Sequence, residues 1–512
     1  MSDRSNNDGV KLQQILQDSM PELSTEFAVL GNPKIKDIEI TGVTNNSKKV
    51  KPGNIFVAYQ GTKTDAHQYI DEAINLGAAT IMVEHPEYLS KYKEIPCFQV
   101  SNGRKALTKL ASSFYSNPAQ QMVVTGITGT NGKTTSTTLI DFILRQLNQN
   151  SGLIGTVEHK INGKTVKAEA TTPPATELYR LLEQMNQQQV EYVTKEVSSH
   201  GLKQDRVSAI NFNIAGITNI SRDHLDFHPT WQDYLASKTK IFQMLAPNSI
   251  AILNADESEA IFMGDKTRGK VITYGVRSSG TMVVAEQIST TGFITKFKYR
   301  ITEEIPTLTN KALTPQSHSV SINMPGTHNI YNSLLAITAC IAAGFPPEKV
   351  IEQAENFPGV FRRLEVIYKN DFTVIDDCAH NPSSLNSVFK TINQIDFNKL
   401  IILYAIRGNR GVDINLDNSE TLTKWVKQLP VKSLFITTCR SHCSKHNQVT
   451  QKEQQHFLSN LDRGQLSYQL IHDLETAVKN ALKSTERGDI MLILGPYAID
   501  QGQNIVRRYL SA

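Results

Sequence analysis

The sequence predicts an α/β protein built from several domains. Short apolar runs typical of buried strands alternate with helical patterns along the chain, and this alternation favours mostly parallel sheets. A glycine-rich loop separates one of these strands from a helix, which is the setting of phosphate-binding loops. Because 512 residues exceed what one hydrophobic core can organise, we expect roughly two to four domains.

Turn signals and periodicity divide the chain into residues 1–118, 119–357 and 358–512. The first region ends at Ser116-Asn117-Pro118, a sequence that breaks a helix. Asn162-Gly163 in the second region predicts a hairpin turn. We expect helices at 73–78, 107–114 and 139–147, and strands at 38–43, 55–58, 80–83, 98–100, 122–124, 192–197, 212–220, 250–254, 373–375, 400–404, 433–437 and 490–494.

The composition argues against several classes of protein. A net charge of +4 is small for this length and gives no sign of a basic nucleic-acid surface. The polar N-terminus lacks a signal-peptide pattern, and no apolar run reaches the ~20 residues that span a bilayer. The cysteine count of five is odd, which does not indicate a disulfide framework. We expect a cytoplasmic enzyme without nucleic-acid or membrane partners; the sequence indicates no oligomeric state.

The strongest motif is the loop Gly126-Ile-Thr-Gly129-Thr-Asn-Gly132-Lys133-Thr134-Thr135 between a strand and a helix. Its glycines let backbone N–H groups approach phosphate oxygens at a helix N-terminus. Lys133 would reach the β and γ phosphates, and the Thr134 hydroxyl would bind Mg²⁺. A glycine turn that merely caps a helix is the bland alternative. We predict ATP binding by Gly129, Thr130, Asn131, Gly132, Lys133, Thr134 and Thr135.

Polar side chains follow two other predicted strands of the same region. Glu196 ends one strand, and His224 follows the other. Because ligands of open α/β sheets bind at the carboxyl ends of the strands, we expect both side chains near the phosphate loop. A carboxylate and an imidazole there suit a divalent metal ion.

The loop Gly-Thr-Asn-Gly-Lys-Thr resembles that of the Mur ligases and their folate-polyglutamating relatives. Further matches follow in order over residues 41–382, and they look most like the tripeptide-synthetase branch of that family. The resemblance implies a three-domain Mur ligase architecture with a P-loop central domain and a Rossmann-like C-terminal domain. It also implies an ATP- and Mg²⁺-dependent ligase that activates the carboxylate of a UDP-N-acetylmuramoyl peptide as an acyl phosphate and joins it to a free amino acid.

The resemblance implies roles for single residues. Thr134, Glu196 and His224 would hold Mg²⁺, and Lys238, in Ala-Ser-Lys-Thr-Lys-Ile-Phe, would be carbamylated and bind a second metal. Asn329 and Asn332 would approach the adenine, Arg363 the γ phosphate, and Asp377 the nucleotide. The implied catalytic set is Lys133, Glu196, His224, Lys238, Arg363 and Asp377.

Other matches concern the UDP-linked substrate. Two N-terminal segments, 45–53 and 61–67, resemble the uridine-diphosphate-binding segments of the family. A later set resembles positions that hold the muramoyl peptide. The implied substrate-binding residues are Ser47, Thr62, Lys63, Thr64, Thr171, Thr172, Ser198, Gln204 and Arg206.

The C-terminal region departs from the family pattern. Arg362 replaces a glycine, and the segments 407–411, 437–442 and 495–499 replace family motifs, the last two belonging to the amino-acid site. These changes argue against diaminopimelate as the amine, although Arg440 and Arg410 could rebuild a carboxylate clamp. Zinc binding or an incidental cluster are both readings of Cys439, His442, Cys443 and His446, and we favour the incidental cluster.

Two alternatives to this function remain open. The first keeps the ligase chemistry on another carboxylate, as in polyglutamylation or specialised metabolism, although the uridine-binding segments disfavour it. The second is a nucleotide-regulated binding protein without turnover. A protein that only binds has no need for a metal-binding pair beside the phosphate loop.

Overall fold

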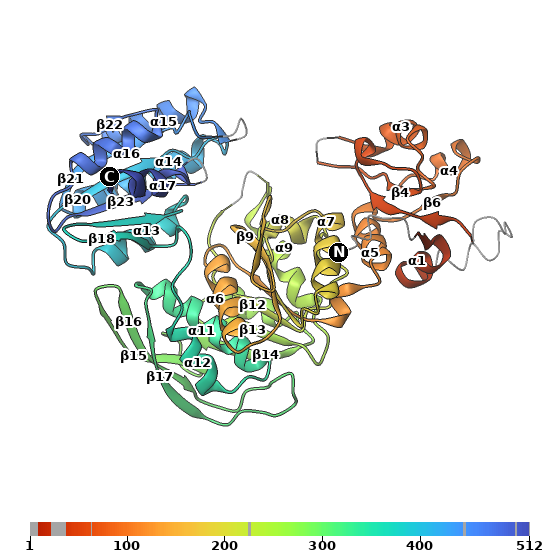
Figure 1. Cartoon of the computed structure of the whole chain (residues 1–512), viewed down its shortest axis with the longest axis horizontal. Coiled ribbons are helices and arrows are strands. Elements are labelled where there is room, and N and C mark those ends of the chain that lie inside the picture. Colours follow the sequence, from red (N-terminus) through yellow and green to blue (C-terminus); the bar gives the residue numbers. More distant parts are fainter. Residues whose placement is uncertain are drawn as a thin grey trace.

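The computed structural model describes residues 9–21, 37–62, 64–223, 227–443, 447–496 and 499–510. These residues form four sheets arranged in three domains. The N-terminal and C-terminal domains lie on opposite sides of the central domain in the view of Figure 1. No helix within the described ranges is long and apolar enough to cross a membrane.

The N-terminal domain is a parallel sheet between helices. Its strands run in the order β3-β4-β5-β6, and the antiparallel pair β1-β2 lies beside them. Helices α1 and α5 contribute to one hydrophobic core and α3 to another. The bounds are β1 Val10–Lys11, α1 Leu12–Ser19, β2 Glu39–Ile40, β3 Gly42–Thr44, β4 Asn54–Val57, α3 Ile70–Asn75, β5 Thr80–Val83, α4 Glu87–Lys91, β6 Cys97–Gln99 and α5 Gly103–Phe114.

The predicted strand 38–43 is the main correction in this domain. It is divided into β2 and β3, which pair in different sheets. Thr41 separates them because it bonds to the turn before β4: its N–H donates to Gly53 O at 3.0 Å and its hydroxyl to Pro52 O at 2.7 Å.

The central domain contains a mixed sheet of order β10-β9-β8-β11-β7-β12-β13-β14-β15-β16-β17. Helices α6, α11 and α12 pack on one face, and α7, α8, α9 and α10 on the other. The bounds are β7 Val123–Thr128, α6 Lys133–Gln146, β8 Ser151–Ile154, β9 Glu158–Ile161, β10 Lys164–Lys167, α7 Ala175–Gln187, β11 Tyr192–Glu196, α8 Ser199–Lys203, β12 Ile214–Ile217, α9 Trp231–Gln243, β13 Ile250–Asn254, α10 Ser258–Gly264, β14 Lys270–Gly275, β15 Val283–Thr291, β16 Ile294–Ile301, β17 Gln316–Ile322, α11 Thr327–Ala342 and α12 Pro347–Glu355.

Parallel pairing of β11, β7 and β12 positions the candidate site. Since parallel strands end at the same edge of a sheet, the loops that follow these three strands meet there. The predicted hairpin is confirmed: β9 and β10 pair around Asn162 and Gly163, both with positive φ.

The C-terminal domain has a sheet of order β18-β19-β23-β20-β21-β22, in which only the β18 pairing is antiparallel within the described residues. Helices α13, α14 and α15 cover one face, and α16 and α17 the other. The bounds are β18 Glu365–Lys369, β19 Thr373–Asp377, α13 Pro382–Ile392, β20 Leu400–Ala405, α14 Val412–Gln428, β21 Val431–Thr437, α15 Gln451–Arg463, β22 Gln469–Leu470, α16 Leu474–Lys483, β23 Ile490–Leu494 and α17 Gly502–Leu510.

His159 makes the central domain sensitive to acid. His159, in β9, is 2% exposed, and burial, with the nearby Lys195 charge, lowers its pKa from 6.5 to about 4. The neutral form of His159 therefore contributes to the free energy of unfolding. This contribution is fully present above pH 6.5 and is lost as the pH falls through about 4. Its complete loss lowers the free energy of unfolding by roughly 3 kcal/mol. When the pH is lowered from 7.5 to 4.5, the melting temperature of His159→Leu should fall less than that of the wild type. The exposed His456→Leu control should follow the wild type; equal losses in all three proteins would contradict this account.

Candidate active site

The phosphate loop connects β7 to α6, and two of its glycines cannot be replaced. Gly129 and Gly132 have φ of +134° and +86°, a region that side chains rarely adopt. A Cβ at Gly129 would overlap the Thr218 hydroxyl, and one at Gly132 would overlap the Asn332 amide. The loop therefore lies against β12 and α11 with its backbone close to both.

Two lysine side chains converge on this loop. Lys133 Nζ donates to Gly129 O at 2.8 Å and to Thr130 O at 2.9 Å, while Lys238 Nζ donates to the same Gly129 O at 2.7 Å. Burial lowers the pKa of both ammonium groups, and the charge of Lys133 lowers that of Lys238 further. Asp223 acts on both lysines in the opposite direction. The loop thus concentrates positive charge where phosphates would bind.

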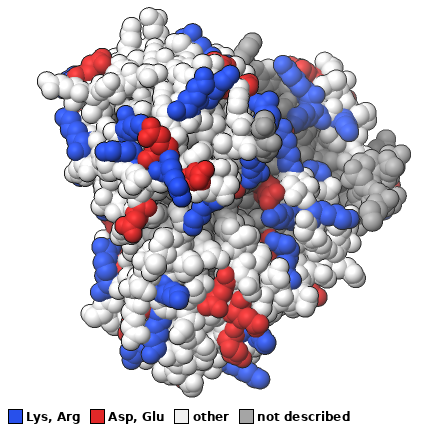
Figure 2. Space-filling view, turned by 60° about the vertical axis from the view of Figure 1, so that its left-hand side comes forward, with Lys and Arg blue, Asp and Glu red and all other residues white. Residues whose placement is uncertain are grey.

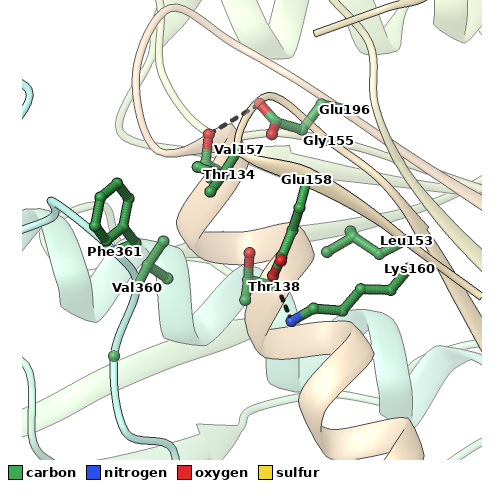
Figure 3. Close-up of a pocket in the computed structure, with 11 residues that line it drawn as sticks. Thr134, Thr138, Leu153, Gly155, Val157, Glu158, Lys160, Glu196, Val360 and Phe361 are labelled. Atoms are coloured by element: carbon green, nitrogen blue, oxygen red, sulfur yellow. Dashed lines mark hydrogen bonds and ion pairs between the residues drawn. The ribbon is translucent and has the colours of Figure 1, made fainter. Parts of the chain in front are cut away.

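Glu196, at the end of β11, lies beside the start of α6. Its carboxylate accepts from the Thr134 hydroxyl at 3.0 Å and from the Thr156 N–H and hydroxyl at 2.7 and 2.9 Å. Thr134 and Glu196 form part of the wall of a cavity of about 110 Å³ between α6, β8–β9 and residues 359–361 (Figure 3). A hydroxyl beside a carboxylate is a donor set that fits Mg²⁺. His224, the third predicted ligand, lies outside the described residues.

The predicted peptide-binding residues of the central domain form one hydrogen-bonded network next to Glu196. The Thr172 hydroxyl donates to Glu196 O at 3.1 Å and accepts from Ser198 N at 3.0 Å. Arg206 donates to Thr172 O at 2.5 Å and to Gln204 Oε1 at 2.6 and 2.9 Å. Thr171 joins the network through Thr156, with 3.0 Å between the hydroxyl oxygens. Residues far apart in sequence are thus joined to Glu196, Thr172 through the backbone carbonyl oxygen of Glu196 and Thr156 through its carboxylate.

The predicted UDP-binding residues lie in the N-terminal domain. Ser47 begins a 3-10 turn after β3, and Thr62 and Thr64 are exposed after β4; Lys63 lies outside the described part of the chain. Sequence reasoning missed Tyr59, whose hydroxyl accepts from Asn45 at 2.8 Å. Burial raises the pKa of Tyr59, and Arg104 and Arg206 oppose the rise. The charge of Arg206 thus reaches Tyr59 across the domain boundary, and the sequence context of Tyr59 gives no signal of this.

The helix α11 brings the predicted adenine contacts to the loop. Asn332 donates to Asn329 Oδ1 at 3.2 Å, and Asn329 donates to Pro325 O at 2.8 Å. Ser136 of α6 donates to Asn332 O at 3.3 Å. Both asparagines are thus held at the start of α11, next to Gly132.

The C-terminal domain contributes Arg363 and Asp377. The N–H of Leu364, the residue after Arg363, donates to Asp377 Oδ2 at 2.8 Å. Burial raises the pKa of Asp377, and the Arg363 charge opposes this rise. Arg363 also lowers the pKa of Lys133. The charge of an arginine in one domain therefore reaches the phosphate-loop lysine of another.

Figure 2 shows Lys and Arg side chains gathered around the recess on the right of the face it presents.

Arg362 has a structural role that the sequence did not reveal. It is 2% exposed and has a φ of +55°, a backbone conformation that favours glycine and that few other residues adopt. Its guanidinium bonds Asp376 at 3.0 and 3.1 Å, Gly495 O at 2.7 Å and the Asp500 carboxylate. Two departures from the family pattern, at 362 and at 495–499, therefore meet in space.

The other departures form no cluster of metal-binding side chains in the described residues. Arg440 is exposed, and Arg410 donates to Asn409 O at 2.9 Å within its own domain. Cys439 lies in the hydrophobic core, and His446 is outside the described ranges. Within the described residues, one cluster of three His, Cys, Asp or Glu side chains could hold a metal ion, and it lies in the N-terminal domain: Asp65, His67 and His85. Both ring nitrogens of His67 are already hydrogen-bonded, to Asp65 at 2.6 Å and to Glu84 N at 3.1 Å.

Arg362→Gly should destabilise the C-terminal domain by about 3–5 kcal/mol, because Asp376 would stay buried without its ion-pair partner. The double variant Arg362→Met/Asp376→Leu, which buries no charge, should recover part of the loss. Denaturant unfolding followed by Trp425 fluorescence, with Trp231 replaced by Phe, measures both. A single variant as stable as the wild type would show that the ion pair does not support the domain.

Models of three family domains match the chain. They are the Mur ligase family catalytic domain over residues 39–115, the Mur ligase middle domain over 127–340, and the Mur ligase, glutamate ligase domain over 362–496. Each match covers all or most of one of the three larger sheets described above.

Whole-chain relatives agree with these matches. The chain is 32% identical over 461 residues to a UDP-N-acetylmuramoyl-L-alanyl-D-glutamate–2,6-diaminopimelate ligase of Clostridium botulinum, covering 89% of this chain and 90% of that protein. The corresponding ligase of Caldanaerobacter subterraneus is 30% identical, with 91% of each chain covered. A solved ligase of the same name has a TM-score of 0.67 at 20% identity, covering 98% of this chain and 100% of the other. The ADP complex of MurF from Thermotoga maritima has a TM-score of 0.60 at 16% identity, with coverages of 92% and 97%. The chain therefore belongs to the Mur ligase family of ATP-dependent, amide-forming ligases.

Proposed function

We propose that the protein adds an amino acid to the carboxylate of a UDP-N-acetylmuramoyl peptide, forming ADP and phosphate. The observation that carries this proposal is the network of Thr172, Ser198 and Arg206 beside Glu196. It would hold the acceptor peptide next to the residues that face the γ phosphate. The curated relatives of Clostridium botulinum and Caldanaerobacter subterraneus are named for this acceptor, and they match over about nine-tenths of the chain.

We assign the three domains to residues 1–118, 119–357 and 358–512. Ser47, Thr62, Lys63 and Thr64 of the first would bind the uridine diphosphate. The second would bind ATP through its phosphate loop, Asn329 and Asn332. The third would supply Arg363, Asp377 and the site of the incoming amine. ATP and a UDP-linked acceptor place this reaction in the cytoplasm.

Within this function the chain's own groups share the phosphoryl transfer. Lys133 and Arg363 would neutralise the γ phosphate from opposite sides as the acceptor carboxylate attacks it and ADP leaves. Thr134, Glu196 and His224 would hold Mg²⁺, which supplies further positive charge at the phosphates. The amine would then attack the acyl phosphate, release phosphate and lose a proton as the amide forms.

We also propose that Lys238 is carbamylated. The amine is 1% exposed, and burial beside Lys133 lowers its pKa, which favours the neutral form that adds to CO₂. The neutral amine adds to CO₂ by forming an N–C bond and releasing one proton, so the side chain becomes an anion suited to a second metal ion; counted from the ammonium form, two protons are lost. It would also relieve the repulsion between two ammonium groups at the Gly129 carbonyl.

A second candidate function uses the same UDP-linked acceptor with an amine other than diaminopimelate. The loops at 437–442 and 495–499 differ from the family motifs, and Arg362 is fully used within its own domain. These loops favour an amine other than diaminopimelate, in contrast to the curated relatives.

Lys133→Ala should abolish turnover, because no lysine would then neutralise the transferring phosphoryl group from the loop. ADP release in the presence of UDP-muramoyl-dipeptide and a panel of amino acids measures it. The control Lys266→Ala removes an exposed lysine of the central domain and should retain wild-type rates. Near wild-type turnover by Lys133→Ala would refute the assignment of the nucleotide site.

Lys238→Ala should be inactive and should be partly restored by formate, which can replace the missing carbamate. Intact-protein and peptide mass spectrometry in bicarbonate should find a 44 Da addition on Lys238, the mass of CO₂. An unmodified Lys238 combined with full activity of Lys238→Ala would reject the carbamate.

Among lysine, ornithine, diaminopimelate and small neutral amino acids, diaminopimelate should be at least about a hundredfold less efficient than the best substrate. The reason is the loss of two charge-assisted hydrogen bonds to its distal group, each worth roughly 1.5–3 kcal/mol. Initial rates at equal concentration decide this. A wide margin in favour of diaminopimelate would contradict our interpretation of 437–442 and 495–499.

A further inference from the structure

The C-terminal domain touches the phosphate-loop edge through a compact group of side chains. Arg407, just after β20, pairs with Asp223 at 3.7 Å. Asn381, at the start of α13, donates to Asp223 Oδ2 at 3.3 Å and to Asn131 Oδ1 of the phosphate loop at 3.4 Å. Asp223 therefore receives two side chains from the other domain.

The C-terminal domain holds both of these side chains in fixed positions. Asn381 caps α13 by accepting from Ser384 N at 2.9 Å, which leaves its amide N–H groups free to cross the boundary. The Arg407 guanidinium donates to His380 O at 3.3 Å, and its backbone carbonyl accepts from Asn415 at 2.7 Å. The contact is therefore between preformed parts rather than between mobile surface chains.

Asp223 is the point where this contact meets the nucleotide site. Its side chain is 4% exposed, so solvent screens its charge little. The same carboxylate raises the pKa of Lys133 and of Lys238, against the effect of burial. Within the C-terminal domain, burial lowers the pKa of His380 to about 4, and the charges of Arg407 and Arg363 act in the same direction. Both arginines are therefore within electrostatic range of His380.

We propose that Arg407 is a positioning residue that docks the C-terminal domain on the phosphate loop through Asp223 and so keeps Arg363 within reach of the γ phosphate. Arg410, in the same loop, does not take this role because it bonds Asn409 O and Asn447 in its own domain. The proposal uses the ATP-dependent chemistry of the family and does not depend on which acceptor or amine is used.

The test compares Arg407→Met, Arg407→Lys, Asp223→Asn and the double variant Arg407→Met/Asp223→Asn. Arg463→Met, which removes an exposed arginine of the same domain, is the matched control. Arg407→Met should lower kcat about thirtyfold or more, as expected when one partner of a buried charge pair is removed. Arg407→Lys should recover part of this loss. Affinity for a non-hydrolysable ATP analogue with Mg²⁺ should stay within about twofold, because the central domain carries the loop.

Two further measurements separate docking from simple loss of folding. The melting temperature of Arg407→Met should equal that of Arg463→Met, while its radius of gyration by small-angle X-ray scattering should increase. In the Asp223→Asn background, adding Arg407→Met should change kcat by no more than about twofold, because the partner is already lost.

Three results would overturn the proposal. They are unchanged kcat and radius of gyration in Arg407→Met, additive effects in the double variant, or a fall in melting temperature that accounts for the loss of activity. Neither the binding of the ATP analogue nor the small-angle X-ray scattering measurement requires the UDP-linked acceptor. A wild type that binds ATP but fails with UDP-muramoyl-dipeptide would therefore count against the proposed acceptor and leave the docking test intact.

Discussion

The candidate site depends on one carbonyl oxygen, that of Gly129, which accepts hydrogen bonds from both Lys133 and Lys238. Two ammonium groups on one buried carbonyl repel each other, and burial alone already disfavours their charged forms. The arrangement becomes favourable when anions enter, whether phosphates, a carbamate or the acceptor carboxylate. Only glycine allows it, because the loop backbone at 129 must lie against Thr218.

The anionic side of the site is built by a different part of the sheet. Glu196 and Asp223 follow the strands on either side of β7, so one carboxylate faces Thr134 and the other faces the lysines. Both residues also connect the loop to other regions, Glu196 through its backbone carbonyl and Asp223 through its carboxylate. Glu196 leads into the network of Thr172 and Arg206, toward Tyr59 of the N-terminal domain. Asp223 leads to the C-terminal domain. One strand edge thus joins all three domains.

Sequence patterns predicted what depends on local order. The strands at 80–83 and 490–494, the hairpin at 162–163 and the phosphate loop follow from periodicity, turn chemistry and glycine spacing. The family resemblance implied Thr172 and Ser198 as peptide-binding residues, and the structure places them side by side next to Glu196, a proximity that the sequence did not predict. Arg362 and Arg407 were not predicted, because their partners are distant: Gly495 and Asp500 for one, Asp223 for the other. A charged side chain at a turn gives no local sign that folding will bury it.

The central claim is that this edge joins an acceptor carboxylate to the γ phosphate before the amine attacks. The most direct measurement follows oxygen, using UDP-muramoyl-dipeptide labelled with ¹⁸O in its terminal carboxylate. Attack through an acyl phosphate transfers one labelled oxygen to the released phosphate, so mass spectrometry should find singly labelled phosphate in step with ADP. Unlabelled phosphate, with both labelled oxygens still on the acceptor carboxylate, would contradict the account.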